Sequence, residues 1–257
     1  MKFTHKVSKG GRFNQIYIPR EAEQNFEVGD LVEVRLLKKK TQLYYSKTLP
    51  KLSEFKEKLI KDIFFIVEPF KEINQIFLIG SFLTQKIDYH DIDIIIINKQ
   101  EDLEEKVYNK LISKFDLKFH IIQIPKDNLL QLMEICPLTK SMFYYHISNK
   151  KFNIILNERI DKNHIKFLLM LPEDLLEIKT NSRSFYDCIR RLITIEKFLE
   201  KKEINPLKIN EELKQLIDPN ILLDIQNNEI IEKKTIEKLR NIIKEKLNKI
   251  KGLIRNG

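Results

Sequence analysis

The segment that most constrains the fold is IFLIGSFLTQKIDYHDIDIIIIN, residues 76–98. It places a Gly-Ser pair directly after one apolar run and two aspartates at the start of the next. Acidic residues are poor strand formers, so Asp91 and Asp93 need a reason to precede a run of isoleucines. Side chains two positions apart in a strand point to the same face. We therefore expect the two carboxylates to project together, while Ile92 and Ile94 face the core.

Two neighbouring carboxylates repel each other and are costly to desolvate unless a cation lies between them. Mg²⁺ prefers oxygen ligands and usually shares one or two carboxylates with substrate phosphates. Gly80 and Ser81 stand between a predicted strand and a predicted helical turn, where backbone N–H groups are free and a phosphate can approach closely. The pattern predicts a metal-dependent phosphoryl-transfer site, with Asp91 and Asp93 as metal ligands and Gly80-Ser81 bonding the phosphates.

The order Gly-Ser, a spacer, and Asp-x-Asp on the next strand resembles the DNA polymerase beta-like nucleotidyltransferases of the minimal type, and Ser81 precedes Asp91 by ten positions. The resemblance implies transfer of NMP from an NTP, with ATP the expected nucleotide, to a hydroxyl of RNA, a protein or a small molecule. It implies Mg²⁺ as the cofactor, with Mn²⁺ as a substitute. One departure is Thr84-Gln85, where many members of the family carry Arg-Gly.

The resemblance also implies a third carboxylate on a later strand, and the candidate strand is FDLKFHIIQIP, residues 115–125. Its polar face holds Asp116, Lys118 and His120, alternating with apolar residues. We expect His120 in the third position, as a metal ligand or a base. Asp116 is the first alternative, and Glu134 on a later helix is the weaker one. A histidine at this position also fits a nucleotide-binding protein that has lost turnover.

A basic and aromatic cluster lies in the segment NSRSFYDCIRRLITIEKFL, residues 181–199. Tyr186 and Arg190 are four apart and share a helical face, with Arg183 and Arg191 nearby. By the resemblance, Arg190 would cover the bound nucleotide. The alternative is a helix surface on which an arginine pairs with Asp187.

The periodicity predicts an α+β chain in three parts: residues 1–40, 41–157 and 158–257. The central part is an expected α/β domain with a short mixed sheet, and the last part is an expected helical bundle. The predicted strands of the central part are 75–79, 91–97 and 117–124, and its predicted helices are 53–67 and 101–115. The apolar stripe of the 53–67 helix is expected at Phe55, Leu59, Ile63 and Ile66. Long helices are predicted over 184–200 and 235–254 in the last part. The second has an apolar stripe formed by Ile236, Leu239, Ile243, Ile250 and Leu253.

The first part contains GRFNQIYIPREAEQNFEVGDLVEV, residues 11–34, after a basic stretch. Its pattern predicts strands over 12–18 and 31–37 with a short helix near 20–24. So few apolar residues bury little surface alone, so a partner copy is expected. The segment resembles the swapped-hairpin module of AbrB/MazE-type transcription factors and antitoxins. The resemblance implies a homodimer that binds DNA through Lys6, Lys9 and Arg12; the alternative is a module for dimerisation only.

The formal net charge is +9, from 46 basic and 37 acidic residues. This charge permits a polyanionic partner but does not identify one. The chain has no apolar run of membrane-spanning length and no apolar signal-peptide core at its start. From this we expect a cytoplasmic location with no membrane partner. Cys136 and Cys188 lack metal-site spacing and are expected to be buried thiols.

Overall fold

The computed structural model describes residues 3–35, 42–85, 89, 91–98, 103–178, 181–226, 229 and 232–256. The chain combines helices with two sheets, as the α+β prediction states. It divides into two compact units, unit 1 over Met1–Lys40 and unit 2 over Thr41–Gly257. The expected sheet and the expected helical bundle both lie in unit 2. The finer three-part division stays a prediction.

Unit 1 contains a two-stranded sheet and one turn of helix. Strand β1 (Ser8–Lys9) pairs antiparallel with β2 (Asn14–Gln15), and α1 (Arg20–Glu23) follows as predicted. The predicted strand over 12–18 was wrong in length, because only 14–15 pair. The predicted strand over 31–37 was wrong for residues 31–35, and 36–37 lie outside the described residues. A strand needs a neighbour for its backbone hydrogen bonds, and residues 31–35 have none in the described part of the chain.

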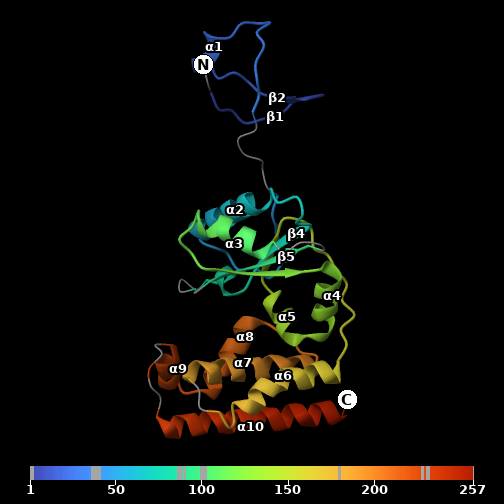
Figure 1. The fold of residues 1–257 in the computed structure, drawn as a ribbon, viewed down its shortest axis with the longest axis vertical. Coiled ribbons are helices and arrows are strands. Elements are labelled where there is room, and N and C mark those ends of the chain that lie inside the picture. Colours follow the sequence, from blue (N-terminus) through green and yellow to red (C-terminus); the bar gives the residue numbers. More distant parts are fainter. Residues whose placement is uncertain are drawn as a thin grey trace. The chain divides into compact units, whose positions relative to one another are not determined.

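Unit 2 is built on a five-stranded mixed sheet (Figure 1). The strand order is β3 (Tyr44–Tyr45), β7 (His146–Ser148), β4 (Gln75–Ile79), β5 (Ile92–Ile97) and β6 (Phe119–Ile124). All neighbours are antiparallel except β5 and β6, which are parallel. The three predicted strands are confirmed, with shorter ends for the second and third. Strands β3 and β7 were missed because two or three residues carry no measurable periodicity.

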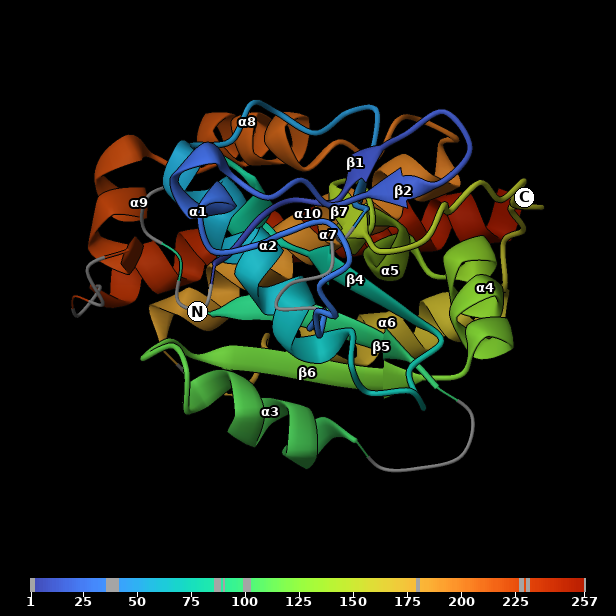
Figure 2. The same ribbon diagram turned by 90° about the horizontal axis from the view of Figure 1, so that it is seen from above.

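Helices cover both faces of this sheet (Figure 2). On one face lie α2 (Glu54–Val67) and α3 (Glu104–Ile112); α4 (Lys126–Ile135) packs on the other face, and α5 (Pro137–Met142) follows it. The α2 helix begins as predicted, since the Ser53 side chain accepts a hydrogen bond from the Lys56 N–H. The predicted helix over 101–115 forms over 104–112; residues 101 and 102 lie outside the described residues. The helices thus cover β4 and β5 on both faces.

The buried face of α2 differs from its sequence prediction. Phe55, expected in the apolar stripe, is exposed, whereas Ile60 and Phe64 are fully buried. The buried stripe also contains the cation Lys56. Lys56 can be buried there because its ammonium has hydrogen-bond partners, the carbonyl oxygens of Phe82 and Thr84.

Five helices make up the rest of unit 2 in the described ranges: α6 (Lys162–Asp174), α7 (Ser182–Leu199), α8 (Pro206–Leu216), α9 (Pro219–Gln226) and α10 (Lys233–Asn256). The two predicted long helices are confirmed in α7 and α10. They pack together, burying Leu239, Ile243 and Ile250 of the predicted stripe of α10. Cys136 and Cys188 are buried free thiols, as expected. Among the described helices, none is long and apolar enough to cross a membrane.

Candidate functional site

The turn after β4 is shaped by a glycine and held by two apolar side chains. Gly80 has φ +84° and ψ −163°, and the 3₁₀ turn η1 (Ser81–Leu83) begins directly after it. The Leu83 N–H donates to the Gly80 carbonyl at 3.2 Å. Phe82 and Leu83 are fully buried, whereas Ser81 is exposed. The local sequence therefore anchors the turn through its apolar residues and leaves the serine at the surface.

Asp93 lies directly against this glycine. Strand β5 pairs with β4 so that Asp93 is the register partner of Ile79, the residue before Gly80. A Cβ atom on Gly80 would lie 2.2 Å from Asp93 Oδ2, so no side chain fits at position 80 while the carboxylate is there. Asp91 stands two residues earlier, just before β5. The structure thus brings the Gly-Ser turn and the Asp-x-Asp motif together.

His120 is the neighbour of Asp93 on the other side. The parallel register of β5 and β6 pairs these two residues, and the His120 Nδ1–H donates to Asp93 Oδ1 at 3.0 Å. The His120 side chain is 57% exposed and that of Asp93 is 21% exposed. The pKa of Asp93 is raised, first by burial and further by the charge of Asp91, against the opposing effect of the His120 hydrogen bond.

A second histidine in the same row of the sheet was missed by the sequence reasoning. His146 on β7 is the register partner of Ile79, so His146, Ile79, Asp93 and His120 lie side by side on four strands. The His146 Nδ1–H donates to the Phe143 carbonyl at 2.8 Å, and burial lowers the pKa of the ring. His146 packs among aromatic rings, and its burial favours the neutral form of the imidazole.

Lys56 of α2 was also missed, and it holds the far end of the Gly-Ser turn. Its side chain reaches the carbonyl oxygens of Phe82 and Thr84, each at 2.8 Å. The ammonium also lies 5.2 Å from the ring centroids of Phe82 and Tyr89. The residue is 6% exposed, and burial lowers the pKa of its ammonium. A charged residue inside an apolar helical stripe was the signal that could have identified it.

The structure does not bring the remaining candidates into this row. Asp116 is exposed in the bend before β6. Glu134 on α4 accepts a hydrogen bond from the Asn157 N–H at 3.4 Å and so holds the segment after β7. Arg190 is exposed on α7. Burial raises the pKa of the nearby Tyr186, and the charge of Arg190 opposes that rise. Lys6, Lys9 and Arg12 are exposed in unit 1.

The donor set at Asp91 and Asp93 fits a divalent cation that prefers oxygen ligands. The two carboxylates repel each other, and a divalent cation bound between them would remove this repulsion. No group of three or more His, Cys, Asp or Glu residues in the described parts of the chain is placed to hold a metal ion. The protein would therefore supply two carboxylates, and water or substrate oxygens would complete the coordination. His120 hydrogen-bonds to Asp93 and would therefore contact a ligand of such an ion rather than the ion itself.

No protein-family model, curated protein or solved structure matches the chain. The resemblances to nucleotidyltransferases and to AbrB/MazE-type modules therefore rest on the motifs themselves. The arrangement of Gly80, Asp93 and His120 is the feature of the site that bears on its function.

Proposed function

We propose that this protein is a divalent-cation-dependent nucleotidyltransferase that moves NMP from an NTP to a hydroxyl acceptor. The observation that carries the proposal is the position of the Asp93 carboxylate directly over Gly80. The glycine turn can bind phosphate and the carboxylate pair can bind a cation. The two can act on the same triphosphate only when they are adjacent. The resemblance to the DNA polymerase beta-like superfamily supports the same assignment.

Each residue of the site has a distinct task in this proposal. Asp91 and Asp93 hold Mg²⁺ or Mn²⁺, and the bound ion supplies neutralisation of the triphosphate charge. Gly80 leaves room for the Asp93 carboxylate beside the turn, and the exposed Ser81 hydroxyl donates to a phosphate oxygen. His120, fixed through Nδ1 by Asp93, leaves Nε2 to accept the proton of the attacking hydroxyl. Lys56 stabilises the turn through its hydrogen bonds to the Phe82 and Thr84 carbonyls.

The test is incorporation of label from each of the four α-labelled NTPs, offered with Mg²⁺ or Mn²⁺ to cellular RNA, cellular protein and small-molecule hydroxyls. We expect one acceptor class to become labelled. We expect Asp93→Asn to reduce labelling to the level of a control without protein, because the substitution removes a cation ligand. Asp116→Asn is the matched control, since Asp116 is an exposed aspartate outside the row, and it should retain activity. Absence of transfer with every nucleotide and acceptor would refute the proposal.

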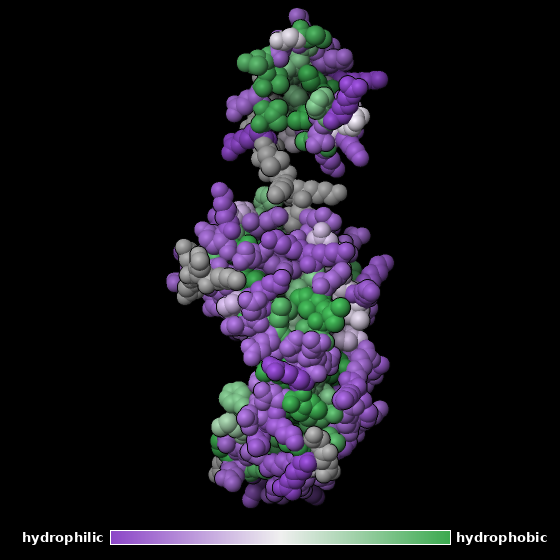
Figure 3. All heavy atoms as spheres, turned by 90° about the vertical axis from the view of Figure 1, so that its right-hand side faces the viewer, coloured by the Kyte–Doolittle hydropathy of each residue, from purple (hydrophilic) through white to green (hydrophobic). Residues whose placement is uncertain are grey.

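A second candidate function is supported by the surface of unit 1. Among its described residues only Ala22 is buried, and most of its large apolar side chains are exposed (Figure 3). They include Val7, Phe13, Tyr17, Leu31, Val32 and Val34. A unit without a core of its own is stabilised when a second copy covers this surface. We propose that unit 1 forms a homodimer and, by its resemblance to AbrB/MazE-type modules, binds DNA through Lys6, Lys9 and Arg12.

A further inference from the structure

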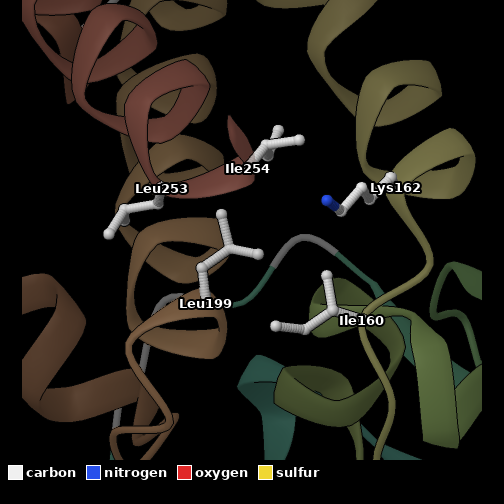
Figure 4. Close-up of a pocket in the computed structure, with 5 residues that line it drawn as sticks. All are labelled: Ile160, Lys162, Leu199, Leu253 and Ile254. Atoms are coloured by element: carbon white, nitrogen blue, oxygen red, sulfur yellow. The ribbon is translucent and has the colours of Figure 1, made fainter. Parts of the chain in front are cut away.

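A cavity of about 400 Å³ opens where α5, the segment before α6 and the end of α7 meet. Charged side chains line it: Lys140, Glu158, Arg159, Lys201, Lys202 and Glu203. Ile160 lines this cavity and also a smaller, mostly apolar one, beside Leu199 and Ile254 (Figure 4). We call these two cavities, which share Ile160 in their linings, the α7-end groove. Its volume lies in the range of small-molecule sites.

The acidic side chains of the groove are already neutralised within the protein. Glu158 pairs with Lys140 at 2.5 Å. Glu203 accepts hydrogen bonds from Tyr144 at 2.6 Å and Lys208 at 2.7 Å. What remains is an excess of positive charge that the carboxylates of the groove do not cancel.

Three cations of the groove make no ion pair with a carboxylate of the described residues, although Arg159 lies close enough to Asp161 for its charge to act on that carboxylate. Lys202 pairs with Glu200 at 2.7 Å, but Arg159, Lys162 and Lys201 make no ion pair with any residue in the described ranges. Arg159 and Lys201 line the larger cavity, and Lys162 lines the apolar end. Figure 4 shows the Lys162 amino group directed between Ile160 and Ile254. The groove therefore offers an anion site at one end and hydrogen-bond donors beside an apolar wall at the other.

Lys201 also occupies a backbone conformation that favours glycine. It has φ +54°, and the Lys201 and Lys202 N–H groups donate to the carbonyls of Phe198 and Lys197. These two bonds form the helix-ending motif whose left-handed position is usually a glycine. A lysine backbone is strained in this conformation, so backbone preference does not explain why position 201 is a lysine. Its ammonium, however, supplies a cation to the groove.

We propose that the α7-end groove binds a nucleoside monophosphate, independently of the Gly80–Asp93 site. Arg159 and Lys201 bond the phosphate, and the nucleoside packs on Ile160, Leu199 and Ile254. Lys162 donates to the ring nitrogen or oxygen acceptors of the base. A phospholipid fits less well, because its hydrocarbon chain would offer the Lys162 ammonium no acceptor.

Isothermal titration of the full chain with AMP, in EDTA and without divalent cations, tests the proposal and excludes a metal-dependent triphosphate site. AMP should bind, and Lys201→Gly and Arg159→Gln should each weaken it by about tenfold or more, the loss expected for one charge-assisted hydrogen bond. The melting temperature of Lys201→Gly should stay the same or rise, because glycine relieves the backbone strain. Lys166→Gln is the matched control, an exposed lysine of α6 outside the groove.

Two further titrations separate the parts of the ligand. Inorganic phosphate should bind more weakly than AMP, and Ile160→Ser should weaken AMP while leaving phosphate binding unchanged. AMP affinity that is unchanged in the Lys201→Gly, Arg159→Gln double variant would overturn the proposal. So would equal affinity for phosphate and AMP, or binding to phosphatidic acid vesicles without binding of AMP. Asp93→Asn should abolish nucleotide transfer and leave AMP binding intact, so the two proposals fail separately.

Discussion

At Gly80 two constraints meet that apply to few residues of the chain. Its positive φ disfavours any L side chain, and the space a Cβ would need is taken by Asp93 Oδ2. Gly252 in α10 is the contrasting case, since a Cβ there meets nothing within 4 Å and its backbone is helical. The same substitution should therefore have opposite effects at these two glycines of unit 2.

We expect Gly80→Ala to lower the free energy of unfolding by about 1–3 kcal/mol through backbone strain, and to push Asp93 away from His120. Gly252→Ala should raise the free energy of unfolding by up to about 1 kcal/mol, because alanine is the better helix former. Chemical denaturation measures both. Equal effects of the two substitutions would show that position 80 tolerates a side chain and that Asp93 is not held against it.

At the scale of the elements, lysines and glutamates join α7, α8 and α10. Glu196 of α7 is 5% exposed and accepts hydrogen bonds from Lys246, at 2.7 Å, and Lys249 of α10. Glu212 of α8 pairs with Lys246 at 3.1 Å. Glu200, at the end of α7, pairs with Lys249 at 2.9 Å. A buried carboxylate is thus compensated by two cations from one neighbouring helix.

This network predicts a loss of stability in acid. Hydrogen bonds from Lys202 and Lys249 lower the pKa of Glu200 to about 2, below its value of about 4.3 in an unfolded chain. A lowered pKa in the fold means that the stabilisation is present above about pH 4 and disappears as the pH falls toward 2. Lys249→Met should lower the free energy of unfolding by about 1 kcal/mol at pH 7. The difference in stability between this variant and the wild type should become smaller as the pH falls from about 4 to about 2.

Thermal unfolding from pH 7 to pH 2 measures this difference. Lys244→Met is the matched control, because Lys244 is an exposed lysine of α10 and makes no ion pair with the described residues. A Lys249→Met deficit that stays constant down to pH 2 would contradict the assignment of the effect to Glu200.

At the scale of the whole molecule, the exposed apolar surface of unit 1 predicts a homodimer. Light scattering of the full chain should give twice the mass of 30.8 kDa. Val34→Asp should give monomers, because a charge on the shared surface cannot be desolvated cheaply. Phe55→Asp is the control, since Phe55 is exposed on unit 2. A wild-type chain that stays monomeric at micromolar concentration would exclude the dimer.

The same dimer should shift DNA in an electrophoretic assay. Replacing Lys9 and Arg12 by alanine should weaken the shift and reduce its salt dependence by about one counterion for each phosphate that is no longer bound. Ala substitution of Lys214, an exposed lysine of α8, is the control. A shift that is unaffected by the Lys9 and Arg12 changes would leave unit 1 as a module for dimerisation only.

The sequence was a good guide where the pattern is local. Period-2 alternation and apolar runs place β4, β5 and β6 within two residues, and Ser53 marks the start of α2. The Asp-Ile-Asp motif predicts two carboxylates on one face; Asp93 lies in β5, and Asp91 stands just before that strand. Residues 31–35 show the limit, because their alternation predicts a strand and no neighbour in the described ranges pairs with them.

By itself, then, the sequence determined the three long strands, the long helices and the pair Asp91 and Asp93, because each depends on residues close together in the chain. Only the tertiary structure decided which distant groups meet that pair. His120 reaches Asp93 through strand register, and Lys56 reaches Thr84 from α2 across 28 positions. The α7-end groove likewise joins Arg159 to Lys201. These contacts arise from packing between elements, which no local periodicity encodes.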